Sequence, residues 1–494
     1  MASNTTYGDF IRPIPKGVMG IGWPLTMAGF AVTRTGFLLM NAKWWAGLIW
    51  LAVGLGVIWI LSIRDKRHRN IADRIGEKRD YRQTVRSGRG LYRSGMLGLI
   101  DAGSIPLPGV LAKVGLSEGL DGSGRPFAIL VHAHSGQYTL PLRCHPQGAS
   151  LVDDDVEDSY VAGWSAFLEA MARTSGVTQV TVTVDTSPES GTHTRRVLSR
   201  HVVSDGVDLA GRAMGEVMLQ LSHGGARNDV VISLDFKYLD SKGRPLPADE
   251  AARMIALLIP GILADLGASG GGSARCLTLD ELAVIARTSY DPASLEAYDR
   301  RDKRDPVHWE DCGPVACDAG WDMMRHDSGL SRTWQMCDPP HSLVVADTLA
   351  SLLKPLDSCD RKRVTLTFRL LDGSKSRVVS EDNRKSSTAA EGQQKHVTVA
   401  TVDTQYRADR QARDVNNGAN LAWFGMTVTA TVLQGSDDVE RLEKATRAVE
   451  GAAGAAAVDL RVCYGAQDTG FAASLPFGLD VEAYKPPSIL TSFA

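Results

Sequence analysis

Two long apolar runs near the N-terminus constrain this chain more than any other feature. The first, residues 17–40, contains Arg34 as its only charge, and the second, residues 44–63, contains none. About twenty helical residues span the roughly 30 Å of a bilayer's hydrocarbon layer. Because three residues separate the runs, the sequence predicts two antiparallel transmembrane helices, at about 18–40 and 44–63, that form a hairpin within residues 1–63.

Basic and aromatic residues around these runs predict how the hairpin is oriented. Lys and Arg gather on the cytoplasmic side of membrane proteins, and Trp gathers at the water–lipid boundaries. Both flanks, and with them both chain termini, are therefore expected in the cytoplasm, and a plasma-membrane location follows. The residues expected to fix anchoring and orientation are Arg12, Lys16, Arg34, Trp44, Trp45, Arg64, Lys66, Arg67 and Arg69.

Arg34 is the anomaly of the first run. A charge in the middle of a transmembrane helix costs roughly 2.5–3.5 kcal/mol on insertion scales. The long side chain either snorkels toward the far interface or faces a neighbouring helix of a larger complex. A signal peptide is the competing interpretation of the first run, but no small-residue cleavage site follows it before the second run.

A basic block follows the hairpin. Residues 64–93 contain eleven Lys or Arg and four Asp or Glu, a net charge of +7, whereas the whole chain carries −3. Anionic lipid headgroups attract such a block by about 1 kcal/mol per basic residue near the surface. Few aromatic residues lie between its charges, so direct nucleic-acid contact is not expected. We interpret residues 64–95 as a juxtamembrane segment that binds the bilayer.

The rest of the chain alternates strand-like and helix-like patterns, which predicts an α+β fold: the transmembrane hairpin followed by α/β sandwich-like cytoplasmic modules with mainly antiparallel sheets. We expect a first module at 96–290, a loop-rich connector at 291–360 and a second module at 361–494. The expected strands are 125–134, 137–144, 177–185, 229–239, 363–371, 422–433 and 458–464. The expected helices are 153–173, 209–222, 247–266, 278–288 and 437–453, and the polar run between 371 and 415 is expected to be helical.

Three local signals refine this outline. Ser135-Gly136 predicts a hairpin turn between two strands. Thr278, followed three residues later by Glu281, predicts a capping box. The glycine-rich run 268–273 predicts a flexible joint. The sequence contains no short-period repeat, although the two modules share a loose strand–helix–strand plan.

A search for chemistry finds no catalytic signature. The phosphate-binding loop, the nucleophile elbow and the H-E-x-x-H zinc motif are all absent. His132 and His134 are expected to share a strand face without a nucleophile beside them. The closest approach to a metal site has spacing that is loose for zinc; its residues are Cys312, Cys317, His326, Cys337 and His341. With seven irregularly spaced cysteines, we expect reduced thiols, no metal, no cofactor and no enzymatic activity.

Several stretches together resemble a known family. They are Leu91–Gly95 (LYRSG), Gly124–Leu130 (GRPFAIL), Gly148–Asp155 (GASLVDDD), Gly313–Met336 (GPVACDAGWDMMRHDSGLSRTWQM), Arg361–Asp372 (RKRVTLTFRLLD) and Tyr464–Leu479 (YGAQDTGFAASLPFGL). In this order they are similar to the PrgI-type membrane proteins of actinobacterial conjugative elements, a branch of Gram-positive type IV secretion. The resemblance covers essentially the whole chain.

The resemblance implies a two-helix membrane hairpin joined to a cytoplasmic part that looks like the N-terminal half of VirB-type transport ATPases without their motor. It implies a non-enzymatic inner-membrane scaffold that docks such an ATPase and other secretion-channel subunits, as an oligomer within a complex. A turn resembling the one that precedes the motor implies a partner-facing motif of Phe471, Leu475, Pro476 and Gly478. A second resemblance is to the EccE-type membrane component of type VII secretion. A membrane-tethered enzyme and a DNA-binding adaptor are further alternatives.

Overall fold

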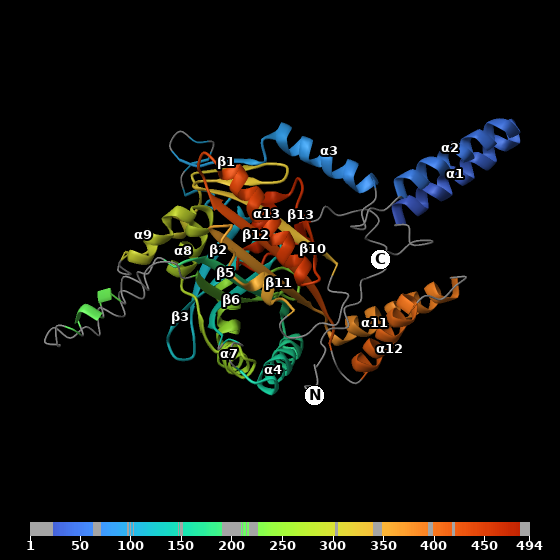
Figure 1. The fold of residues 1–494 in the computed structure, drawn as a ribbon. Coiled ribbons are helices and arrows are strands. Elements are labelled where there is room, and N and C mark those ends of the chain that lie inside the picture. Colours follow the sequence, from blue (N-terminus) through green and yellow to red (C-terminus); the bar gives the residue numbers. More distant parts are fainter. Residues whose placement is uncertain are drawn as a thin grey trace.

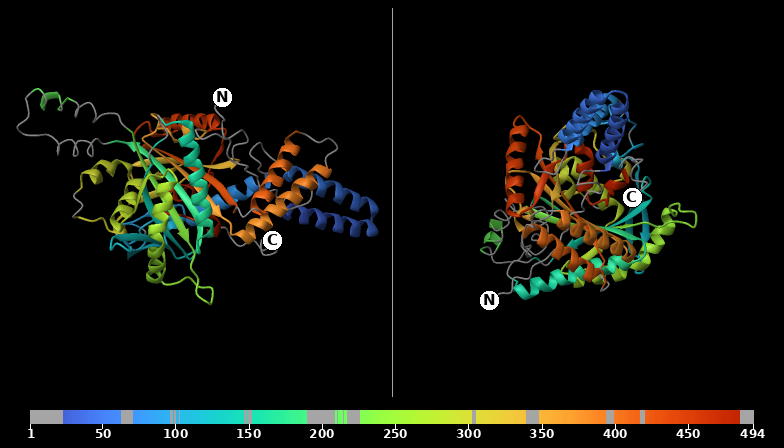
Figure 2. Two further views of the ribbon diagram at one scale, coloured as in Figure 1. Left: turned by 90° about the horizontal axis from the view of Figure 1, so that it is seen from below. Right: turned by 90° about the vertical axis from the view of Figure 1, so that its right-hand side faces the viewer.

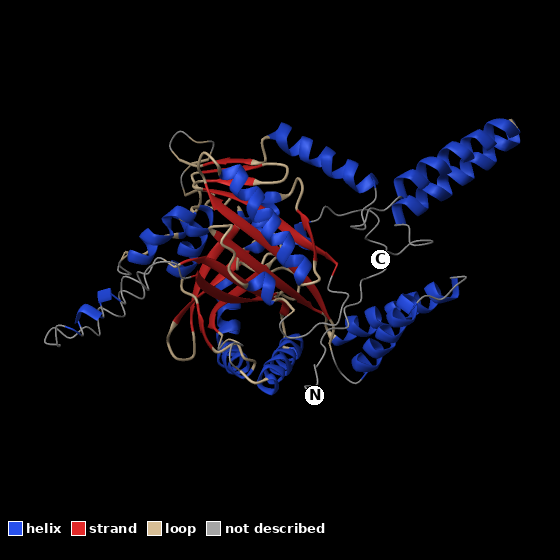
Figure 3. Cartoon of the chain, viewed as in Figure 1, coloured by secondary structure: helices blue, strands red, loops and turns tan. Residues whose placement is uncertain are grey.

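The computed structural model describes residues 23–484, except for 63–70, 96–97, 99, 102, 147, 149–151, 190–208, 210, 214, 217–225, 302–304, 339–347, 394–398 and 417–419. The helix expected at 209–222 therefore lies mostly outside the described residues. The rest is a mixed α+β structure built around one large antiparallel sheet, with helices on its faces (Figure 3).

Two helices form an antiparallel hairpin at the N-terminal end of the described chain (Figure 1). Helix α1 (Trp23–Ala42) and helix α2 (Trp44–Ser62) are separated by one residue, Lys43. Glycine allows them to approach closely, because a Cβ at Gly36 would lie 2.5 Å from Leu51 Cδ2. Such contacts through small residues are typical of helix pairs in membranes. Helix α3 (Ile71–Ser87) then leads to strand β1 (Leu91–Arg93).

The sheet has thirteen strands in the order β1-β8-β9-β10-β12-β11-β5-β6-β4-β3-β2, with β7 paired to β4 and β13 to β10. The first half of the sheet and its covering helices come from the N-terminal part of the chain. The elements are β2 (Val114–Leu120), β3 (Pro126–His132), β4 (Gln137–His145), α4 (Asp154–Arg173), β5 (Val177–Pro188), β6 (Ala226–Phe236), α7 (Ala248–Ala268) and β7 (Ser273–Cys276). Its C-terminal part comprises β8 (Ala316–Ala319), β9 (Met324–His326), β10 (Gly329–Asp338), α10 (Ala350–Leu353), β11 (Arg361–Leu370), β12 (Ala422–Leu433), α13 (Asp438–Ala455) and β13 (Asp459–Val462).

The two parts are copies of one topology. Along the chain the first part runs β4-α4-β5-β6-α7-β7, and its strands lie in the sheet in the order β5-β6-β4-β7. The second part runs β10-α10-β11-β12-α13-β13 along the chain, and its strands lie in the sheet in the order β11-β12-β10-β13. Both are β-α-β-β-α-β units of the ferredoxin-like kind. The copies join edge to edge, since β5 pairs antiparallel with β11 from Gln179–Arg369 to Thr186–Lys362. This pairing relates the halves by a pseudo-twofold axis and makes the sheet continuous.

The two faces of the sheet differ in chemistry. One face is apolar: Val180 and Val364 lie on it, and α4 and α7 cover it in the first half while α10 and α13 cover it in the second. The opposite face carries buried hydroxyl groups at alternate positions; examples are Thr181, Thr183, Ser233, Thr333, Thr365 and Thr429. Helix α8 (Leu279–Tyr290) and helix α14 (Gln467–Ser474), each of which follows the last strand of one half, pack on this polar face.

A helical arm interrupts the second half. Helices α11 (Gly373–Gln393) and α12 (Val399–Asn416) lie between β11 and β12, and they stand out from the sheet body on the same side as the α1–α2 hairpin (Figure 2). Their mutual contact buries small polar side chains such as Ser376 and Ser380. The arm therefore draws little stability from apolar burial.

Most local expectations are confirmed, and one is wrong. The turn at Gly136, the capping box between Thr278 and Glu281, and every expected strand and described helix occur, with shifted ends. The stretch expected to be a loop-rich connector contains β8, β9 and β10, and β10 is a central strand. The glycine run 268–273 forms the end of α7 and a turn into β7, where Gly272 (φ +67°) packs against the carbonyl of His145.

Candidate functional site

The α1–α2 hairpin exposes an unusual amount of apolar surface. Fifteen of the thirty exposed large hydrophobic residues in the described chain lie between Met27 and Ile60. Soluble proteins seldom expose continuous apolar surface of this kind without a partner or a membrane to cover it. Trp44 and Trp45, at the hairpin turn, are 69% and 53% exposed, and the Lys43 ammonium lies 6.0 Å from the Trp45 ring centroid.

Length and hydropathy alone do not confirm a two-helix transmembrane hairpin. Among the described helices, α7 is the one that is long and apolar enough to cross a membrane, and α2 contributes a shorter apolar stretch, Trp44–Ile60. Helix α7 packs six buried residues against the sheet, as the core helix of a soluble protein does. In α1, Arg34, three threonines and an asparagine reduce the hydropathy.

The residues expected to orient the hairpin are only partly described. Arg34 is exposed on the outer side of α1. Trp44 and Trp45 lie at the turn, as expected. The remaining six lie outside the described residues: Arg12, Lys16, Arg64, Lys66, Arg67 and Arg69.

Residues 465–484, which we call the closing segment, lie across the polar face of the sheet. Its backbone carbonyls accept hydrogen bonds from side chains of both halves. Thr365 Oγ1 donates to Ser474 O at 2.8 Å, and Ser233 Oγ donates to Pro476 O at 2.8 Å. Arg369 forms ion pairs with two acidic residues near its end. The closing segment thus ties the two halves together on the side opposite most of the covering helices.

This segment contains the motif expected to face a partner, and the structure corrects that expectation. Phe471, Leu475, Pro476 and Gly478 are all buried inside the chain. Gly478 has φ +63°, and a Cβ there would lie 1.9 Å from Asp235 Oδ1. The motif therefore packs against this chain's own sheet and does not face a partner in the described chain. The sequence resemblance pointed to a partner because it gives no information on which residues contact the motif.

Two buried histidines occupy equivalent positions in the two halves. His132, opposite Gln137, bonds through Nε2 to Thr139 Oγ1 at 3.0 Å; His326, opposite Gly329, bonds through Nε2 to Ser331 Oγ at 2.7 Å. Thr139 follows Gln137 by two positions, and Ser331 follows Gly329 by two positions. The histidine and its hydroxyl partner are therefore placed in the same way in both halves. This shared network is a sign of the duplication that the sequence did not reveal.

A backbone carbonyl completes each network. His132 Nε2 donates to Phe477 O at 2.8 Å, and His326 Nδ1 donates to Tyr290 O at 2.6 Å. Tyr290 ends α8, which follows the first half, and Phe477 follows α14 of the second half, so each half's C-terminal extension reaches the histidine of the other. Burial lowers the pKa of both imidazoles to about 4, so both are neutral at pH 7.

Carboxylates lie beside these networks, but they face the core. Thr139 Oγ1 donates to Asp235 Oδ1 at 2.5 Å, and burial raises the pKa of this carboxyl well above its usual value. Near the seam, Asp185 accepts from Arg361 and Arg363. Burial alone would raise the pKa of Asp185, but the two guanidinium groups hold it below the usual range. His134 does not meet His132: β3 ends at His132, and His134 stacks on Tyr484 at 4.5 Å.

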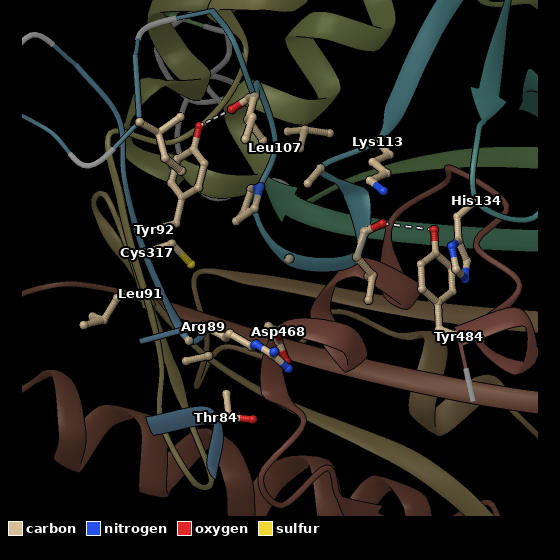
Figure 4. Close-up of a pocket in the computed structure, with 18 residues that line it drawn as sticks. Thr84, Arg89, Leu91, Tyr92, Leu107, Lys113, His134, Cys317, Asp468 and Tyr484 are labelled. Carbon is tan, nitrogen blue, oxygen red and sulfur yellow. Dashed lines mark hydrogen bonds between the residues drawn. The ribbon is translucent and has the colours of Figure 1, made fainter. Parts of the chain in front are cut away.

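One surface pocket lies between β1, the loop before β2 and the closing segment (Figure 4). Its volume is about 540 Å³, and its lining is mainly apolar, with Arg89 and Lys113 as cations and Asp468 as an anion. The Tyr484 hydroxyl beside it donates to Val110 O at 3.0 Å. The volume is that of a small-molecule site, but its described lining residues do not pair a nucleophile with a base. The sequence offered no signal for it, because its walls come from segments far apart in the chain.

Thiols and metal ligands do not gather in the part of the chain that the structure describes. All seven cysteines are free, and no group of three or more His, Cys, Asp or Glu is placed to hold a metal ion among the described residues. Burial raises the pKa of the Cys312 and Cys317 thiols far above its usual value. Of the loose metal set considered above, His326 is instead bonded within the sheet, and His341 lies outside the described residues.

No protein family matches the sequence, and no curated protein is detectably similar to it.

Proposed function

We propose that this chain is a membrane-anchored scaffold subunit of a type IV secretion-like transfer apparatus, which holds a VirB-type transport ATPase at the plasma membrane. The observation that carries the proposal is an exposed apolar hairpin joined to a duplicated α+β body. The order of the sequence motifs that resemble PrgI-type proteins supplies the choice of apparatus.

The hairpin supports the anchoring role. Its exposed apolar side chains, such as Phe30, Phe37 and Trp59, belong to two helices. Each helix is about 30 Å long at 1.5 Å per residue, which matches the thickness of the hydrocarbon layer. The turn between the helices consists of Lys43 alone, with Trp44 and Trp45 beside it. A bilayer would cover the apolar surface and leave this turn at the far boundary, with the body in the cytoplasm.

The body supports a scaffold more than a catalyst. Perturbed pKa values often mark active sites when the groups converge in a cleft. Here the most perturbed groups, such as His132, Asp235 and His326, are buried and bonded to the chain's own backbone and hydroxyls. Their arrangement stabilises the contact between the halves and leaves the outer faces and the helical arm for partners.

Extraction and co-purification test this proposal. The full chain should remain in the membrane pellet at high pH, and in detergent it should co-purify with a VirB-type ATPase. Release into the supernatant would contradict the anchor. Recovery of type VII core subunits instead would favour the EccE-like alternative, and nucleotide turnover by the purified chain alone would contradict the scaffold role.

A further inference from the structure

Helix α1 carries one charged residue, and its position on the helix is informative. The side of α1 that meets α2 includes Val32, Gly36 and Met40, each of which lies against a residue of α2. Arg34 lies on the outer side of the helix and is exposed. Arg34 therefore takes no part in the packing of the hairpin.

The surface around Arg34 is apolar. Phe30 is one turn before it, and Phe37 and Leu38 are one turn after it; residues three or four apart share a helix face. These three side chains are 61%, 61% and 63% exposed. One cation thus stands in the middle of an apolar stripe, an arrangement that a lipid-facing surface alone does not require.

The position of Arg34 along α1 works against escape to either boundary. At 1.5 Å per residue it lies about 12 Å from Ala42 at one end and about 16 Å from Trp23 at the other. The Cα–Cβ bonds of a helix tilt toward its N-terminus, away from the nearer end. Snorkelling to the outer boundary would therefore run against the direction of the side chain. A charge at this depth is normally paired inside a bundle.

Neither this chain nor a second copy supplies the partner from its hairpin. Arg34 makes no ion pair within the described residues. The sequence has no Asp or Glu between Asp9 and Asp65, so the hairpin of another copy has no carboxylate to offer. The counterion must come from a different molecule at the same depth.

We propose that Arg34 is the docking point for a transmembrane helix of another subunit, which presents an Asp or Glu carboxylate to the guanidinium in the middle of the bilayer. The Phe30, Phe37 and Leu38 side chains supply the apolar contacts on either side of this ion pair. The inference rests on the proposed membrane anchor, and it specifies the chemistry of the partner.

A carbodiimide cross-link tests the pairing directly. In membranes of the cells that make the protein, the variant Arg34→Lys places an amine beside the partner carboxylate, and dicyclohexylcarbodiimide joins the two as an amide while it takes up the water released. Mass spectrometry should find an amide to an Asp or Glu in a hydrophobic segment of another protein. The matched control, Leu38→Lys, places an amine on the same face one turn away and should give at least ten-fold less of that product.

Other outcomes overturn the inference. An inserted Arg34→Lys variant that gives no such amide, equal yield from both positions, or an adduct to phosphatidylserine alone would assign Arg34 to lipid. If the Lys variant does not insert, Arg34→Gln decides on native gels: at least ten-fold less of the larger complex is expected, and an unchanged complex refutes the docking point. Extraction of the unaltered chain at high pH would instead refute the proposed anchor, a result that is distinguishable from all of these.

Discussion

The contact between the closing segment and the sheet should be sensitive to one methyl group. Gly478 has φ +63°, and a Cβ there would lie 1.9 Å from Asp235 Oδ1 and 2.6 Å from Thr139 Oγ1. The left-handed conformation costs a non-glycine residue about 1–2 kcal/mol. Displacing the buried carboxyl from its hydrogen bonds costs about 1–3 kcal/mol more. Gly478→Ala should therefore lower the free energy of unfolding by about 2–5 kcal/mol.

Urea unfolding of the full chain in detergent measures this loss through tryptophan fluorescence. Trp309 is a local reporter, because its ring centroid lies 6.0 Å from that of Phe477. The matched control is Gly451→Ala in the interior of α13, where a Cβ meets nothing within 4 Å. That control should stabilise the chain by about 0.5–1 kcal/mol. If Gly478→Ala costs less than about 1 kcal/mol, the closing segment does not bind the sheet as described.

Three further predictions concern buried groups. Lowering the pH from 7 to 5 should reduce the free energy of unfolding by about 2 kcal/mol for each of His132 and His326. The reason is that the unfolded imidazole binds a proton near pH 6.5, whereas burial lowers its pKa in the folded chain to about 4. Equal urea midpoints at the two pH values would contradict this prediction. Asp185→Asn should lower the free energy of unfolding by about 3–5 kcal/mol, since it leaves the buried guanidinium groups of Arg361 and Arg363 without their carboxylate. The control Glu169→Gln, in an exposed ion pair, should lower it by under about 1 kcal/mol. Similar thermal unfolding of both variants would contradict the importance of the Asp185 ion pairs. The Cys312 thiol should be alkylated at pH 8 only after unfolding, because it is buried. Mass spectrometry of the Cys312 peptide measures this separately from the six other cysteines, and prompt labelling of that peptide in the native chain would place the thiol at the surface.

Signals that act over a few residues were sufficient for much of the fold. Alternation of Thr and Val predicted β5, helical periodicity predicted α4, and the Thr278–Glu281 spacing predicted a cap whose two hydrogen bonds are present. Strand β10 was missed because one of its faces is polar but buried: Ser331 and Thr333 lie under the closing segment, so burial does not follow hydrophobicity. A strand of this kind reads as a loop.

The helical hairpin, the antiparallel α+β class and the alternating order of the elements all follow from local patterns in the amino-acid sequence, because helix periodicity, strand alternation and caps depend on neighbouring residues. The pairing of β5 with β11, the likeness of the two halves and the equivalence of His132 and His326 are visible only in the folded chain. These features join residues more than one hundred positions apart, and many pairings satisfy the same local pattern. The burial of Phe471 and Gly478 was decided in the same way, by a complementary polar face that forms only when both halves are folded.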